Sequence, residues 1–188
     1  MPAPTLIDEK RALIEAGLVV LRRSGTDGCT VADVLHEAGL STRAFYRHFA
    51  SKDELVLAIY ERDAVASSAR LATRLHAACS PQAALEIWID ENLALGFETR
   101  RARRTRPLAR EGLHLEAAFP AEFARIVAGV IDPLASVLRA AGSPDPERDA
   151  RSIHAITWAL VAEKLAGGSL SRDAAKAHVL RFCDAVIA

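Results

Sequence analysis

The chain has 188 residues, 51% of them hydrophobic and 26% charged, and its 24 basic side chains balance 24 acidic ones. This length suggests one or two domains and is enough to bury roughly 70% of the surface of the unfolded chain. Because the net charge is zero, the chain as a whole has no electrostatic field that would attract nucleic acid or a membrane. No apolar run approaches the ~20 residues of a membrane span. A local basic patch remains compatible with DNA binding.

Cysteine use indicates the compartment. Cys29, Cys79 and Cys183 are odd in number and far apart, so they predict neither a disulfide framework nor a metal site. The first ten residues contain no apolar stretch typical of a signal peptide. We therefore expect a cytoplasmic protein that uses no metal or other cofactor.

The hydrophobic pattern predicts an all-α protein, because apolar residues recur at spacings of three and four and strand-like alternation is almost absent. Capping residues and glycines mark the ends of the expected helices. In chain order the helices are expected at about 6–23, 31–39, 42–48, 52–78, 81–100, 106–117, 120–141, 146–167 and 171–187, about nine in all. The arginine-rich segment 100–106 is predicted to be a turn between two of them.

Residues 30–49, TVADVLHEAGLSTRAFYRHF, carry the most informative pattern. Two short capped helices flank a tight turn at Gly39, which can take a positive φ. The apolar residues of the pair would hold it against the first helix, and these are Val34, Leu40, Phe45 and Phe49. The outward face of the second member would then consist of Thr42, Arg43, Tyr46 and Arg47. This arrangement predicts a helix-turn-helix, whose second helix enters the major groove of DNA.

Local charge agrees with this prediction. Between residues 40 and 51 there are basic side chains but no carboxylate, whereas residues 1–60 together carry a net charge of −1. Arg43 and Arg47 are long enough to reach guanine edges, and Thr42 could contact a polar base edge or a thymine methyl. The side chains expected at phosphates, at or beside helix N-termini, are Thr30, Ser41, Tyr46, His48 and Lys52. Each of these residues alone is more typical of capping or packing, and their combination favours DNA binding.

Residues 7–67 resemble the DNA-binding domain of the tetracycline-repressor-type (TetR) transcriptional regulators. The resemblance covers about a third of the chain and lies in Thr30-Val31, Asp33, Ala38-Gly39-Leu40-Ser41, Phe45-Tyr46, His48-Phe49 and Ser51-Lys52-Asp53-Glu54-Leu55. It implies a homodimer that binds a palindromic double-stranded DNA operator, acts as a repressor, and is released when a small molecule enters a C-terminal domain, here 68–188. The family's frequent DNA contacts carry over to Thr30, Ser41, Thr42, Tyr46, His48 and Lys52. Arg43 departs from the glycine common in the family, so base specificity cannot be copied from relatives.

The C-terminal part contains no nucleophile elbow, phosphate loop or metal-spaced His or Cys pair. The resemblance places several aromatic and histidine side chains on helices that enclose effectors in this family. These candidate ligand-binding residues are Trp88, Phe97, His114, Phe119 and Phe123. His154 and Trp158 are added because they lie four apart on one helix face and could line a pocket. Ordinary core packing is the alternative for each of them, and the aliphatic composition favours an apolar effector.

Two further features of this part carry expectations. The arginine cluster from Arg100 to Arg106 could be a solvated turn, could pair with acidic residues of the DNA-binding domain, or could add to the field at the DNA. The apolar stripes of the last two helices are too wide for one side of a small domain. They predict a homodimer through 146–187, with intramolecular packing as the alternative. The rival functions are an all-α small-molecule-binding protein or enzyme with a vestigial helix-turn-helix, and a dimeric scaffold.

Overall fold

The computed structural model describes residues 5–25 and 28–187, and within these ranges the chain forms nine α-helices and no strand. The helices are α1 (Leu6–Ser24), α2 (Val31–Ala38), α3 (Thr42–His48), α4 (Lys52–His76), α5 (Pro81–Phe97), α6 (Thr99–Ala118), α7 (Pro120–Ala141), α8 (Pro146–Leu165) and α9 (Arg172–Ile187). The predicted all-α class is confirmed. None of the helices in the described ranges is both long enough and apolar enough to cross a membrane.

Short-range signals determine where the first helices begin. Thr5 and Thr30 form capping boxes with the residues three positions later, so both the hydroxyl and the downstream carboxylate bind backbone N–H groups. Ser41 accepts a hydrogen bond from the N–H of Ala44 in the same way at the start of α3. Gly39 ends α2 with φ +64°, a conformation that a residue with a Cβ rarely adopts.

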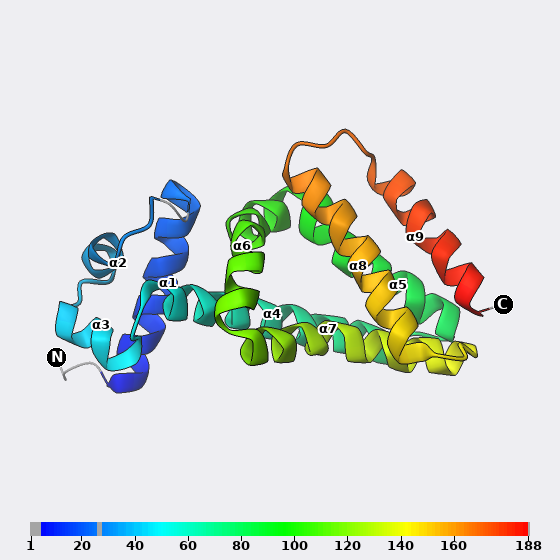
Figure 1. Cartoon of the computed structure of the whole chain (residues 1–188), viewed down its shortest axis with the longest axis horizontal. Helices are drawn as coiled ribbons and strands as arrows, with labels where there is room; N and C mark the ends of the chain where they lie inside the picture. Colours follow the sequence, from blue (N-terminus) through cyan, green and yellow to red (C-terminus); the bar gives the residue numbers. More distant parts are fainter. Residues whose placement is uncertain (1–4, 26–27, 188) are drawn as a thin grey trace.

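The molecule is elongated, with α1, α2 and α3 at one end and α5, α8 and α9 at the other (Figure 1). The long helix α4 runs between the two ends, α6 stands across the middle, and α7 runs from the foot of α6 to the end that holds α5, α8 and α9. Two hydrophobic clusters correspond to the two ends, one around Leu13 and Phe45 and the other around Trp88 and Leu134. Helix α4 contributes to both clusters, so the predicted domain boundary at residue 67 falls inside a continuous helix.

Helix α6 and the start of α7 also belong to the N-terminal cluster. Leu108 and Leu115 of α6 and Ile126 of α7 are buried in the cluster that contains Leu13 and Leu57. The core beneath the three N-terminal helices is therefore completed by residues far from them in the sequence.

The prediction that segment 100–106 is a turn is wrong, because α6 begins at Thr99 and includes all of its arginines. The break between α5 and α6 is only one residue long, since Glu98 caps the end of one helix and the start of the next. Arginine is a good helix former, and nearby carboxylates compensate part of the charge.

Candidate nucleic-acid interface

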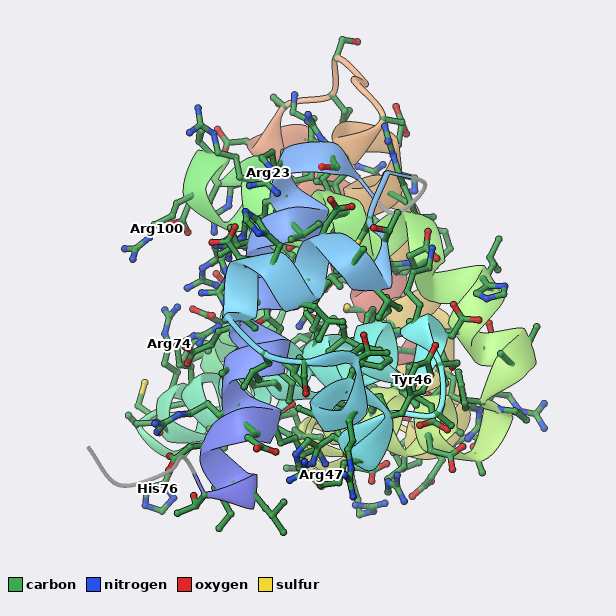
Figure 2. The ribbon with its side chains drawn as sticks, turned by 90° about the vertical axis from the view of Figure 1, so that its left-hand side faces the viewer. Arg23, Tyr46, Arg47, Arg74, His76 and Arg100 are labelled. Atoms are coloured by element: carbon green, nitrogen blue, oxygen red, sulfur yellow. The ribbon has the colours of Figure 1, made fainter. Side chains whose placement is uncertain are left out.

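Helix α3 separates its side chains into a buried face and an exposed face. Ala44 and Phe45 are buried, and the ring of Phe45 lies 5.8 Å from that of buried Phe49. The side chains predicted to face outward are all exposed, and these are Thr42, Arg43, Tyr46 and Arg47. Figure 2 shows Tyr46 and Arg47 on the outer side of α3, at the end of the molecule formed by α1 to α3. The packing therefore presents three polar groups and a tyrosine on one short helix.

Of the residues predicted at or beside helix N-termini, Thr30, Ser41 and Lys52 lie there, whereas Tyr46 lies within α3 and His48 at its end. Thr30, Ser41 and Ser51 precede α2, α3 and α4, and Lys52 is the first residue of α4. Thr30 is engaged within the protein, because its hydroxyl donates to Asp33 over 2.6 Å while accepting from the N–H of the same residue. These hydrogen bonds from Thr30 lower the pKa of Asp33, so the carboxylate stays charged beside the start of α2.

His48 differs from its predicted setting. It is the last residue of α3, and its ring is largely buried, with Nε2 3.0 Å from Oε2 of Glu9 of α1. The same carboxylate oxygen lies 3.3 Å from a guanidinium nitrogen of Arg47. The basic end of α3 is therefore paired with an acidic side chain from another helix.

Sequence reasoning missed Glu9, which is buried. A signal was present, because Glu9 lies four residues before Leu13 and seven before Ala16, on the stripe of α1 that faces the core. An acidic residue on a buried stripe requires a partner, and that partner lies 39 positions away in the sequence.

The candidate ligand-binding residues do not form one lining. Trp88, Phe97, His154 and Trp158 belong to or pack against the C-terminal cluster, whereas Phe119 and Phe123 pack against the N-terminal cluster. His114 is exposed on α6, with Nε2 3.1 Å from a carboxylate oxygen of Asp53.

Trp88 and His154 are the pair that the structure brings into contact. Their rings lie 6.3 Å apart at 68°, and the indole N–H of Trp88 donates to the carbonyl of Val130 over 2.9 Å. Burial lowers the pKa of His154, which favours the neutral ring. In the described part of the chain no group of three or more His, Cys, Asp or Glu side chains could hold a metal ion.

The arginine cluster divides between internal partners and solvent. Arg104 pairs with Asp63 of α4 at 2.7 Å, and Arg101 pairs with Glu91 of α5 at 2.7 Å. Burial would raise the pKa of Glu91, but hydrogen bonds from Arg101 and Arg74 outweigh it and leave the pKa below its usual value. The side chains of Arg100, Arg103 and Arg106 are exposed, and Arg100 points away from the body of the molecule (Figure 2).

The outer surface of α8 and α9 is apolar in part. Phe182 is 43% exposed although Val179 and Cys183, its neighbours on the same helix, are fully buried. Ile156 and Leu160 of α8 are half-buried. Ile156 and Leu160 pack against the C-terminal cluster, and Phe182 presents an exposed ring on α9.

Two short capped helices joined by a tight turn, the second with an exposed polar face, form a helix-turn-helix. In this protein the helix-turn-helix domain is attached to a larger helical bundle. A family model described as bacterial regulatory proteins, tetR family, matches residues 13–59. Among curated proteins, the HTH-type transcriptional regulator CymR of Pseudomonas putida is 34% identical over 119 residues, 59% of each chain. The uncharacterized HTH-type transcriptional regulator YvdT of Bacillus subtilis is 29% identical over 83 residues, 44% of this chain and 43% of its own. The alignments thus span about half of these relatives.

Solved structures of regulators share the whole fold. The reduced form of E. coli NemR has a TM-score of 0.74 at 20% identity, covering 93% of this chain and 96% of its own. FadR from Bacillus subtilis in complex with stearoyl-CoA has a TM-score of 0.72 at 16% identity, covering 92% and 96%. Residues 13–59 are therefore similar to the TetR family of bacterial regulatory proteins, and the chain as a whole shares the fold of these solved structures.

Proposed function

We propose that the protein is a homodimeric transcriptional repressor that binds a palindromic operator and is released from it by a small, apolar molecule. The observation that carries the proposal is the exposed face of α3, where Thr42, Arg43 and Tyr46 project from a helix anchored by buried Phe45. A seven-residue helix supplies only a few base contacts, so two copies are needed to read two half-sites about 34 Å apart.

The residues of the interface take two kinds of role in this proposal. Arg43 lies in the first turn of α3 and is the leading reader of a guanine edge, with Thr42 beside it. Tyr46 and Lys52 contact phosphates, as do the groups at the N-termini of α2 and α3, Thr30 and Ser41. His48 belongs to the same set. Arg47, which the sequence offered as a second reader of guanine, joins this set because it lies in the last turn of α3, and both side chains have Glu9 as a partner within the protein.

The surface of α8 and α9 is the proposed seam of the dimer, within residues 146–187. Phe182 and Leu160 are large apolar side chains that the single chain leaves partly exposed, and a second copy would cover them. Such a seam relates the two copies by a two-fold axis, which is the symmetry of a palindromic operator.

The effector is proposed to bind among the C-terminal helices. Trp88 lies in the larger apolar cluster with the ring of His154 against it, and burial lowers the pKa of His154, which favours its neutral form. FadR from Bacillus subtilis shares this fold, and its crystal structure is of a complex with stearoyl-CoA, a molecule with a long apolar chain. Occupancy would shift the population toward dimers whose recognition helices no longer match the operator spacing.

The decisive experiment is a footprint of the purified protein on the intergenic DNA beside its own gene, repeated over a range of salt concentrations. We expect a protected two-fold symmetric site.

Lys52→Ala should weaken binding to operator and unrelated DNA alike and lower the salt slope by about 0.9 per lost phosphate contact. Arg43→Ala should instead relax the preference at one base pair per half-site, since a bidentate guanine contact is worth roughly 1–3 kcal/mol of discrimination. Absence of salt-dependent DNA binding, together with turnover of a substrate, would favour the enzyme alternative.

A further inference from the structure

Glu9 is the charged member of the three buried polar residues in the part of the chain that the structure describes; the others are Ser143 and Thr157. It lies in the first turn of α1, and its carboxylate faces the C-terminal end of α3. A buried carboxylate is unfavourable unless a cation or hydrogen-bond donor compensates it. His48 and Arg47 provide this compensation.

The two partners of Glu9 differ in how accessible they are. The side chain of His48 is 10% exposed, so its ring stays packed between α1 and α3. The side chain of Arg47 is 45% exposed, and DNA can reach it. Arg47 is therefore the partner that can exchange Glu9 for another anion.

The groove that Arg47 and His48 help to line is basic and apolar. Its volume is about 470 Å³, and it is lined by Leu6, Ile7, Lys10, Arg11, Ile14, Arg47, His48 and Arg62. Lys10 lies 5.9 Å from the ring centre of Phe49, and Arg11 pairs with exposed Asp8 at 3.3 Å. Removing the negative charge of Glu9 would leave this surface more strongly positive.

We propose that Glu9 competes with DNA for Arg47, and so weakens binding to DNA of any sequence. The inference rests on the proposed function, because it concerns the DNA-binding face. Arg47 can contact a phosphate only by giving up its contact at 3.3 Å with Glu9. The net gain in binding free energy from that phosphate contact is therefore small. Phosphate contacts are independent of sequence, so Glu9 lowers the background affinity against which Arg43 and Thr42 discriminate.

The test compares Glu9→Gln with Glu15→Gln by titration of a random-sequence labelled duplex at several salt concentrations. Glu15 is an exposed residue of the same helix, and its substitution changes the net charge by the same amount. We expect Glu9→Gln to raise the affinity for this duplex about ten-fold at low salt. Its salt slope should be steeper by about 0.9 per protomer, the value for one added phosphate contact. Glu15→Gln should keep the wild-type slope.

Two further variants separate contact from charge. Adding Arg47→Ala to Glu9→Gln should abolish both the gain in affinity and the steeper slope. Glu9→Asp keeps the charge but shortens the side chain, so its slope should lie between those of the wild type and Glu9→Gln. Both substitutions should leave the protein folded, because Arg47 is exposed and because glutamine at position 9 keeps a hydrogen-bond acceptor. Circular dichroism would verify the fold of each variant.

The proposal is overturned if Glu9→Gln has the same slope as Glu15→Gln, or if the double variant keeps the gain. It is also overturned if Glu9→Asp behaves as the wild type while Glu9→Gln gains affinity without a change in slope. A wild-type protein that binds no DNA at any salt concentration refutes the proposed function instead, so the two failures are distinguishable.

Discussion

Truncation of Phe182 provides a quantitative test of the proposed dimer seam. A phenylalanine side chain buries about 200 Å² when fully covered, and 43% of Phe182 remains exposed, which leaves about 85 Å² for a partner. At about 25 cal/mol per Å², covering this area contributes about 2 kcal/mol per protomer, or about 4 kcal/mol for two copies. Phe182→Ala should therefore weaken the dimer about 1000-fold.

Sedimentation equilibrium over nanomolar to micromolar protein concentrations would measure this change. Leu113→Ala is the matched control, because Leu113 is 83% exposed but lies on α6, outside the proposed seam. We expect the control to dimerise as the wild type does, and Phe182→Ala to form a folded monomer with only weak DNA affinity. If Phe182→Ala dissociates at the same concentration as the wild type, then the apolar surface of α9 is not the seam.

Three predictions concern the stability of helices α5, α6 and α8. A Cβ at Gly96 would lie 3.0 Å from the carbonyl oxygen of Val161, so Gly96→Ala should lower the free energy of unfolding by about 1–3 kcal/mol. A Cβ at Gly112 would meet only one atom, at 4.0 Å, so Gly112→Ala should raise the free energy of unfolding by about 0.5–1 kcal/mol through helix propensity. Thermal melts would test both variants, and melting temperatures that shift in the same direction would refute the packing argument. Burial lowers the pKa of His154, so below about pH 6.5 the unfolded chain binds a proton that the folded chain excludes, and the free energy of unfolding should fall as the pH decreases. His154→Leu should flatten this dependence in urea unfolding at pH 5 to 7, and an unchanged slope would show that another group is responsible.

Local signals explain why the helix-turn-helix could be located from the sequence. The bounds of α3 follow from the Ser41 cap, the turn at Gly39 and the apolar pair of Phe45 and Phe49, which all act within a few residues. The exposure of Thr42 and Arg43 then follows from helical periodicity.

The features that the sequence did not predict depend on distant partners. The break before α6 carries no glycine or proline, and the arginines after it are accommodated by carboxylates of α4 and α5. Glu9 gains its role only when α1 and α3 pack together. The separation of Trp88 from Phe123 likewise depends on how α5 and α7 divide between the two clusters.

The shared N-terminal core has a consequence for building chimeric regulators. Grafting residues 7–67 onto an unrelated sensor would remove Leu108, Leu115 and Ile126 from the buried cluster that contains Leu13 and Leu57. Such a graft would expose a hydrophobic surface and would be prone to aggregate. A transplant that keeps α6 and the first turns of α7 with the DNA reader, and exchanges only the helices beyond them, preserves the complete core.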